Sequence, residues 1–239
     1  MRIDKLLAHT GFGSRKDVKQ LLKQKAVTVD GKVVIKPNVH VDPDNEEICV
    51  YGEKIIYREF IYLMLHKPDG YLSATFDHHA PTVIDLVPDE FIHYELAPVG
   101  RLDKDTEGFV LLTNDGELNH IITSPKNNIK KTYYAKIDGK VTDIHQDLFK
   151  QGVELDDGYV TKEAELTIIK SNDVSEITLS ISEGKYHQVK RMFEAIGMKV
   201  IYLKRLSIGA LKLDESLQVG DSRLLNEEEM AYILSLKQR

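Results

Sequence analysis

The sequence holds a single cysteine, Cys49, among its 239 residues. One cysteine excludes an internal disulfide and any zinc site built from several cysteine ligands, as expected for a reducing compartment. No apolar run reaches the roughly 18–20 residues that span a bilayer. The stretch MRIDKLLAHTG at the start lacks the apolar core and cleavage site of a secretory signal. We therefore expect a cytoplasmic protein that makes no use of a membrane.

Negative charge predominates, but positive charge is concentrated in the first 36 residues. The whole chain carries 32 Lys and Arg against 38 Asp and Glu, a formal net charge of −6. Residues 1–36 hold nine of these cations and three aspartates, which gives +6 and leaves −12 on the other 203 residues. A basic head on an acidic body predicts contact with a polyanion. The alternative is a lysine-rich helix face that is only solvated.

The basic head has the pattern of two helices followed by a hairpin. Helical spacing of apolar residues starts at Ile3 and is broken at Gly11–Gly13. Ser14 then suits the N-cap of a second helix. The segments 27–29 and 32–35 flank an Asp-Gly pair, which predicts a tight hairpin.

The rest of the chain predicts a larger domain that begins near Phe60. We expect a small domain over residues 1–52, a linker over 53–59 and the larger domain over 60–239. Strands are predicted at 61–65, 109–113, 132–137, 164–169 and 176–181, and helices at 116–123, 143–150, 187–196 and 226–236. Because these strands and helices do not alternate regularly, the α+β class is favoured.

A dense charged stretch, GRLDKDTEG at residues 100–108, precedes the apolar run Phe109–Leu112. The spacing of its acidic residues imitates the start of a calcium loop, but Asn114 stands where such a loop needs a bidentate Glu. No glycine-rich phosphate motif and no histidine cluster with metal-ligand spacing occurs. What remains is Asp103, a carboxylate in a turn near a strand. Taken alone, such an Asp most often bonds nearby backbone amides.

A second dense stretch, EGKYHQVKRMF at residues 183–193, combines an apolar helical face with cations. Lys185, His187, Lys190 and Arg191 are able to pair with a buried carboxylate or with phosphates. The alternative is a salt-bridged helix start without further function.

Several motifs together resemble those of the pseudouridine synthases. GRLDKDTEG is similar to the family's catalytic signature, and KTYYAKI, ISEGKYHQVKRMFEAIG and Arg205-x-x-Ile208-Gly209 are similar to its other motifs, in the same order. DKLLAHTGFGSRKDVKQLLKQKAVTVDGKVV resembles the S4 RNA-binding domain. The resemblance is to the RsuA branch, which modifies small-subunit ribosomal RNA. It implies an S4-like head and an α+β catalytic domain with a mixed or antiparallel sheet.

The resemblance implies that Asp103 is the catalytic residue. In this family the Asp of the G-R-L-D signature acts near C1′ of the target uridine, by covalent attack or by removing a C2′ proton. The neighbouring acids, Asp105 and Glu107, are expected to fix the turn.

The resemblance also assigns three supporting residues. Tyr133 matches the tyrosine that stacks on the target base, and Lys190 matches the basic residue that pairs with the catalytic Asp. Arg101 resembles the residue that helps to hold the base out of the stack. Extruding a base costs a few kcal/mol, which stacking on an aromatic side chain partly offsets.

The implied function is the isomerisation of a uridine in ribosomal RNA, most similar to enzymes that act at the uridine numbered 516 in 16S RNA. We expect no cofactor, no metal, a monomer, and ribosomal RNA or a pre-ribosomal small-subunit particle as partner. RNA contacts are expected from Arg2, Lys5, Ser14, Arg15, Lys16, Lys19, Lys23, Lys185, His187 and Arg191. The alternatives are a large-subunit (23S) synthase, a non-catalytic ribosome-associated RNA-binding protein, and a sugar hydrolase, against which the lack of a convincing second catalytic carboxylate counts.

Overall fold

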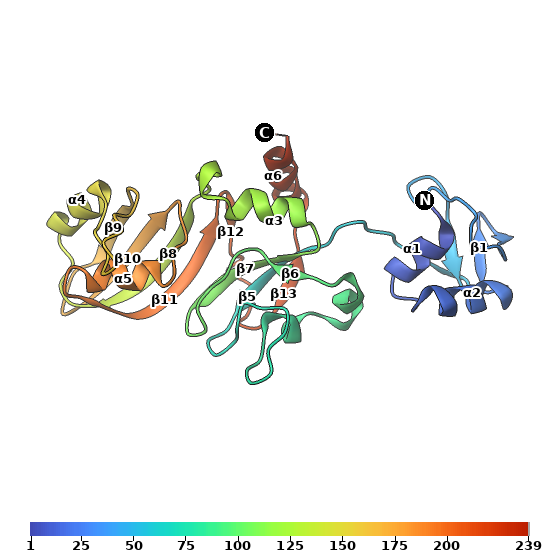
Figure 1. Ribbon diagram of the computed structural model, residues 1–239, viewed down its shortest axis with the longest axis horizontal. Helices are drawn as coiled ribbons and strands as arrows, with labels where there is room; N and C mark the ends of the chain where they lie inside the picture. Colours follow the sequence, from blue (N-terminus) through green and yellow to red (C-terminus); the bar gives the residue numbers. More distant parts are fainter. Residues whose placement is uncertain (239) are drawn as a thin grey trace. The chain divides into compact units, whose positions relative to one another are not determined.

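The computed structural model describes residues 1–238, which divide into two compact units. The first unit comprises Met1–Ile61 and Asp89–Glu95, and the second comprises the rest of the described chain. Both units combine helices with antiparallel or mixed sheets (Figure 1), which confirms the predicted α+β class. Within residues 1–238, no helix has the length and apolar character required to cross a bilayer.

The first unit packs two helices on a four-stranded antiparallel sheet with the order β2-β1-β3-β4. Its elements are α1 (Ile3–His9), α2 (Arg15–Lys23), β1 (Val27–Val29), β2 (Lys32–Val33), β3 (Ile48–Val50) and β4 (Glu53–Lys54), and the short 3-10 helix η2 (Asp89–Tyr94) also belongs to it. Ser14 caps α2 as predicted, since its hydroxyl accepts from the backbone N–H of Asp17 at 3.4 Å. Asp30 and Gly31 both have positive φ, 48° and 75°, as the tight hairpin requires.

The predicted boundaries of the head differ from the structure in two places. The second hairpin strand, predicted at 32–35, ends at Val33. The segment 53–59, predicted as a linker, begins with β4, whose residues pair with Cys49 and Val50. Ordered structure of the first unit therefore continues past Gly52, because the edge of its sheet needs one more strand.

The second unit is built on a nine-stranded mixed sheet. Seven strands follow the order β13-β5-β7-β11-β8-β10-β9, with β12 beside β11 and β6 beside β7. The strands are β5 (Tyr62–Lys67), β6 (Ala97–Pro98), β7 (Glu107–Thr113), β8 (Lys131–Asp138), β9 (Glu165–Lys170), β10 (Val174–Ile181), β11 (Lys199–Ile208), β12 (Leu211–Lys212) and β13 (Ser222–Leu224). The helices are α3 (Gly116–Thr123), α4 (Asp143–Gln151), α5 (Gln188–Glu194) and α6 (Glu227–Lys237), with the 3-10 turns η1 (Val83–Leu86) and η3 (Pro125–Asn127). All four predicted helices of this domain and all five predicted strands are present within a few residues of their predicted limits.

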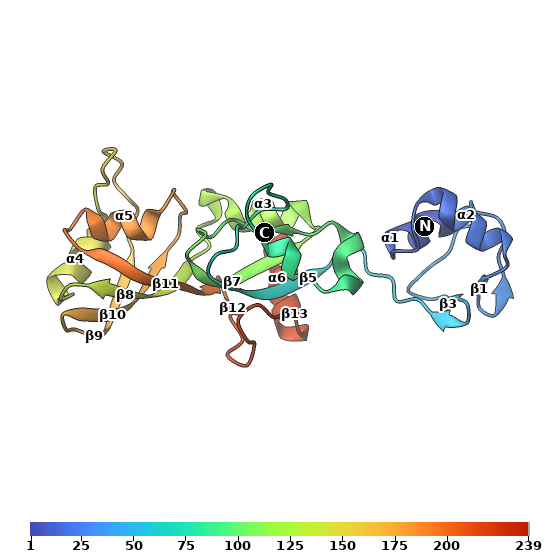
Figure 2. The same ribbon diagram turned by 90° about the horizontal axis from the view of Figure 1, so that it is seen from below.

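The ten-residue strand β11 joins the two parts of this sheet. It pairs antiparallel with β8 along most of its length and parallel with β7 at Lys204 and Arg205 (Figures 1 and 2). The sequence did not predict this strand. Its register shifts between Val200 and Tyr202 and again between Arg205 and Ser207, and such bulges break the alternation that identifies a strand.

The meeting of β7 and β11 depends on a residue without a side chain. Gly108 pairs with Arg205 and has a φ of 106°. A Cβ atom built on Gly108 would lie 2.3 Å from the Arg205 carbonyl oxygen. Both the conformation and the close approach of the two backbones therefore require glycine.

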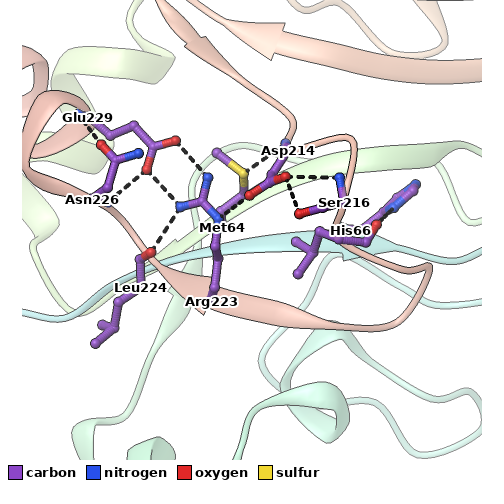
Figure 3. Close-up of polar contacts among 9 residues, drawn as sticks. Met64, His66, Asp214, Ser216, Arg223, Leu224, Asn226 and Glu229 are labelled. Carbon is purple, nitrogen blue, oxygen red and sulfur yellow. Dashed lines mark hydrogen bonds and ion pairs between the residues drawn. The ribbon is translucent and has the colours of Figure 1, made fainter.

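Arg223 ties α6 to the sheet. Arg223 on β13 donates to Asp214 (Nε to Oδ2, 2.6 Å) and to both carboxylate oxygens of Glu229 on α6 (2.8 Å each), as Figure 3 shows. Glu229 also accepts from the backbone N–H of Asn226, which caps α6. The carboxylates raise the pKa of Arg223 above its usual value. The fork geometry thus ties a loop, a strand and a helix together.

Replacing Gly108 with alanine should destabilise the second unit, because β7 and β11 would have to separate. We expect a loss of roughly 3–5 kcal/mol in the free energy of unfolding, measured by urea titration. Gly116→Ala is the matched control, since Gly116 begins α3 with open space around it and no positive φ. That variant should stay within about 1 kcal/mol of the natural protein. Equal stability of the two variants would contradict this account of the β7–β11 contact.

Candidate active site

Asp103 lies in a tight turn that leads directly into β7. The Thr106 N–H donates to the Asp103 carbonyl oxygen at 3.1 Å, which closes the turn. The N–H of Leu102 donates to Oγ of buried Ser73 at 3.0 Å, which fixes the chain before it. The Asp103 side chain is 25% exposed, so the carboxylate is partly shielded but open to a ligand.

A buried lysine holds this turn from beneath. Lys67, the last residue of β5, is fully buried, and its ammonium donates to the carbonyl oxygens of Pro68 (2.9 Å), Lys104 (3.0 Å) and Thr106 (2.8 Å). Burial lowers the pKa of Lys67 to about 8, although nearby carboxylates, Asp69 first among them, oppose the shift. The backbone oxygens therefore give the buried ammonium its hydrogen-bond partners, and the ammonium in turn fixes the backbone of the turn.

Sequence reasoning missed the role of Lys67, because its burial at the end of β5 is visible only in the structure. A buried charge needs several partners, and here they are backbone oxygens, which no sequence motif marks.

Two basic side chains face the Asp103 carboxylate, Lys190 from α5 and His187 from the residue before it. Lys190 Nζ lies 3.0 Å from Oδ2, and His187 Nε2 lies 3.6 Å from Oδ1. His187 is the N-cap of α5 and has a left-handed backbone, with φ 49° and ψ 32°. The structure therefore brings the two dense charged stretches of the sequence into one site.

Lys190 is shared between two carboxylates. Its ammonium also donates to Asp105 Oδ1 at 2.6 Å. Burial alone would lower the pKa of Lys190, but the hydrogen bonds to Asp105 and Asp103 outweigh it and raise the pKa. For Asp105, burial raises the pKa, but the hydrogen bond and the charge of Lys190, together with a backbone hydrogen bond, lower it further, so the net shift is downward. Lys190 therefore stays charged beside Asp103.

The expected turn-fixing role of Asp105 and Glu107 is not what the structure shows. Asp105 reaches outward to Lys190, while Glu107 accepts from the Tyr202 hydroxyl at 2.6 Å. The turn is held instead by Lys67 and by backbone hydrogen bonds.

A small cavity of about 70 Å³ opens beside Asp103. Arg101, Tyr133, Lys185 and His187 line it together with Asp103, and apolar walls come from Leu102, Ile181, Val189 and Leu203. Tyr133 is 9% exposed and pairs across the sheet with Leu179 on β10 and Arg205 on β11. The cavity thus combines an anionic carboxylate, an aromatic ring and several cations, a set suited to a planar polar ring attached to a sugar phosphate.

Two other features bear on where the site lies. A larger cavity of about 720 Å³ lies between α4 and β9, and Lys130, Lys150, Lys162, Asp147, Glu163 and Glu165 supply its charges. These charges are balanced, and Lys130 is already paired with Glu165. Among residues 1–238, no group of three or more His, Cys, Asp or Glu side chains is arranged to hold a metal ion. Size alone therefore does not make the larger cavity the reactive site.

The predicted RNA contacts fall into two groups. Lys5, Arg15, Lys16, Lys19 and Lys23 are exposed on the first unit. The other expected contacts are engaged within the protein. Arg2 pairs with buried Asp4, Ser14 caps α2, Lys185 lies 4.2 Å from the centre of the Tyr159 ring, and Arg191 pairs with Asp156 and Asp157. Acidic loop partners satisfy Arg191, and its place in the motif gave no sign of them.

Comparison with known proteins places these observations in a family. Residues 61–195 match the RNA pseudouridylate synthase family, and residues 1–47 match the S4 domain. The chain is 51% identical over 232 residues to the uncharacterized RNA pseudouridine synthase YtzG of Bacillus subtilis (strain 168), covering 96% of this chain and 97% of that protein. It is 39% identical over 236 residues to ribosomal small subunit pseudouridine synthase A of Escherichia coli (strain K12), covering 98% and 100%.

A solved structure agrees with the sequence relatives. A crystal structure of a pseudouridylate synthase superposes with a TM-score of 0.68 at 36% identity and covers 99% of each chain. The chain therefore belongs to the RsuA-type branch of the RNA pseudouridine synthase family, is an isomerase, and carries an S4 domain in its first unit.

Proposed function

We propose that this enzyme isomerises one uridine of small-subunit ribosomal RNA to pseudouridine, with Asp103 as the catalytic residue. The observation that carries the proposal is the Asp103 carboxylate, held by Lys190 and His187 at the edge of a cavity that also contains Tyr133. Relatives named for the small ribosomal subunit, about 40% identical along nearly the whole chain, support the choice of RNA.

The reaction moves a base without adding or removing atoms overall. The bond from N1 to C1′ breaks, the uracil turns, and a bond from C5 to C1′ forms. C5 then loses a proton and N1 gains one. An ionised Asp103 serves either route to the broken bond, by attacking C1′ or by removing a proton from C2′. Because only bonds and protons are exchanged, the proposed chemistry needs no redox group and no metal.

The surrounding side chains have distinct roles in this proposal. Lys190 fixes the direction of the Asp103 carboxylate, as a single-point partner rather than a bidentate one. Tyr133 stacks on the target base inside the cavity. Arg101, which is exposed at the cavity edge, holds the base out of the RNA stack. A carboxylate that is already aimed loses little freedom when the substrate binds.

The S4 unit is proposed to bind the RNA backbone. Its helix α2 carries the exposed cations Arg15, Lys16, Lys19 and Lys23 opposite the buried residues Val18 and Leu22. Exposed lysines that release counterions from phosphates give affinity without sequence preference. Selection of the uridine is therefore left to the catalytic unit.

The choice of RNA is tested by mapping pseudouridine in ribosomal RNA from cells with and without this gene. We expect the deletion to lose one pseudouridine in 16S RNA, at the uridine numbered 516, and complementation to restore it. Loss of a site only in large-subunit RNA would overturn the substrate, and an unchanged map would overturn the proposed cellular role.

Asp103→Asn should abolish isomerisation while RNA binding stays within about threefold, because the change keeps the shape of the side chain and removes its charge. We expect turnover of a 16S RNA fragment to fall on the order of 10³-fold or more. Asp105→Asn is the matched control, since Asp105 touches the same lysine but is 66% exposed. It should retain activity within about tenfold. If both variants lose activity equally, Asp103 has no special role.

Turnover should decline as the pH rises through about 8, where Lys67 loses its proton. The ammonium has three N–H donors for three carbonyl oxygens, whereas the neutral amine has only two, so the turn that carries Asp103 loosens. Single-turnover rates between pH 6.5 and 9.5 measure this decline. Lys67→Arg keeps its charge over this range, so its turnover should not decline. Lys131→Met is the control and should show the same decline as the natural protein, although the pKa of Lys131 is also lowered to about 8 by burial and by Arg205.

Replacing Lys16, Lys19 and Lys23 together with glutamine should weaken RNA binding and reduce its dependence on salt. Three lost phosphate contacts lower the slope of log K against log salt by roughly 2, measured by fluorescence anisotropy between 50 and 300 mM salt. The control replaces three exposed lysines of the second unit, Lys140, Lys170 and Lys199. An equal loss in the control would mean that α2 is no special RNA contact.

A further inference from the structure

The loop between β10 and α5 is anchored at both ends by buried polar side chains. Glu183 and Gln188 are each 4% exposed. Gln188 Nε2 donates to Glu183 Oε1 at 2.8 Å, and the N–H of Lys185 donates to Gln188 Oε1 at 2.9 Å. Glu183 also accepts from the Tyr159 hydroxyl at 2.9 Å. These bonds fix the short segment Gly184–His187 that projects between the anchors.

The projecting segment presents two stacked rings. The centroids of Tyr186 and His187 lie 3.8 Å apart with an angle of 17° between the ring planes. Tyr186 is 76% exposed, and its carbonyl oxygen accepts from Arg191 Nη1 at 3.5 Å. Because Arg191 is itself fixed by Asp156 and Asp157, the backbone of the segment is restrained from both sides. An exposed aromatic ring is therefore held in a set position.

The stacked rings stand beside the proposed catalytic carboxylate. His187 Nε2 lies 3.6 Å from Asp103 Oδ1, and Tyr186 stacks on the ring of the same histidine. The small cavity at Asp103, about 70 Å³, is the proposed place of the target base. The nucleotides next to the target then lie along its edge. Arg101, an exposed cation at this edge, suits the phosphates that link them.

We propose that Tyr186 stacks against the base adjacent to the reacting uridine, so that the Tyr186–His187 pair forms a subsite for a flanking nucleotide. This inference rests on the proposed function, because it assumes that the RNA binds with its target uridine at Asp103. Stacking on an aromatic ring accepts any base, with a preference for larger ring systems. A ring that is already fixed binds with little loss of freedom. The subsite would hold the strand in place while the target uracil leaves C1′ and turns.

The test uses short 16S RNA fragments that carry the fluorescent base 2-aminopurine immediately 5′ or 3′ of the target uridine. One of the two probes should be quenched when the natural enzyme binds, and equally by Tyr186→Phe, which keeps the ring. Tyr186→Leu keeps bulk without a ring, and should abolish the quenching and weaken binding about 5- to 150-fold. Tyr51→Leu, at a tyrosine 68% exposed in the first unit, should leave the quenching unchanged.

The same fragments separate this inference from the proposed function. Isomerisation by the natural enzyme, with quenching that survives in Tyr186→Leu, would overturn the flanking subsite and leave the function intact. Quenching that depends on Tyr186 without any isomerisation of the fragment would support the subsite and overturn the proposed substrate. Loss of quenching in Tyr186→Phe would also overturn the subsite, because the ring and not the hydroxyl is proposed to act.

Discussion

The geometry of the second unit at its reactive end depends on one buried ammonium group. Lys67 is fully buried, and its three hydrogen bonds end on backbone oxygens rather than on a carboxylate. A carboxylate partner would neutralise the charge of Lys67. Carbonyl oxygens accept its hydrogen bonds without neutralising it, so the positive charge still interacts with the nearby carboxylates. The turn at Asp103 therefore receives both its shape and a positive field from the same side chain.

Charged side chains are arranged differently in the two units, in line with the proposed roles of RNA binding for the first unit and of the reaction for the second. In the second unit, Lys190 and Arg191 are paired with carboxylates of the protein. On α2 the lysines stand exposed with no ion pair to restrain them. Paired cations lose little freedom when they fix a reactive group, while exposed ones are free to follow a flexible phosphate chain. One net charge of −6 thus conceals two opposite electrostatic surfaces.

The sequence predicted the local structure and the order of the motifs. It did not predict features that depend on backbone groups far away in the sequence. Period and capping signals found the helices, the cap at Ser14 and most of the strands, because these depend on neighbouring residues. The strand β11 was missed since two bulges break its alternation and Arg205 occupies a buried position. Lys67 was missed because two of its carbonyl partners lie 37 and 39 residues away, and no side-chain pattern marks a backbone oxygen. The pairing of Lys190 with Asp105 was likewise hidden, because both acids of the turn look alike in sequence.

The position of β11 has a consequence for when the sheet can form during synthesis of the chain. Within the sheet, β11 alone connects the part that carries Asp103 with the part that carries Tyr133, and it lies in the last sixth of the chain. A nascent chain that has not yet released residues 199–208 from the ribosome holds both halves without their register. The two parts of the sheet therefore gain their register only when synthesis of the chain is nearly complete.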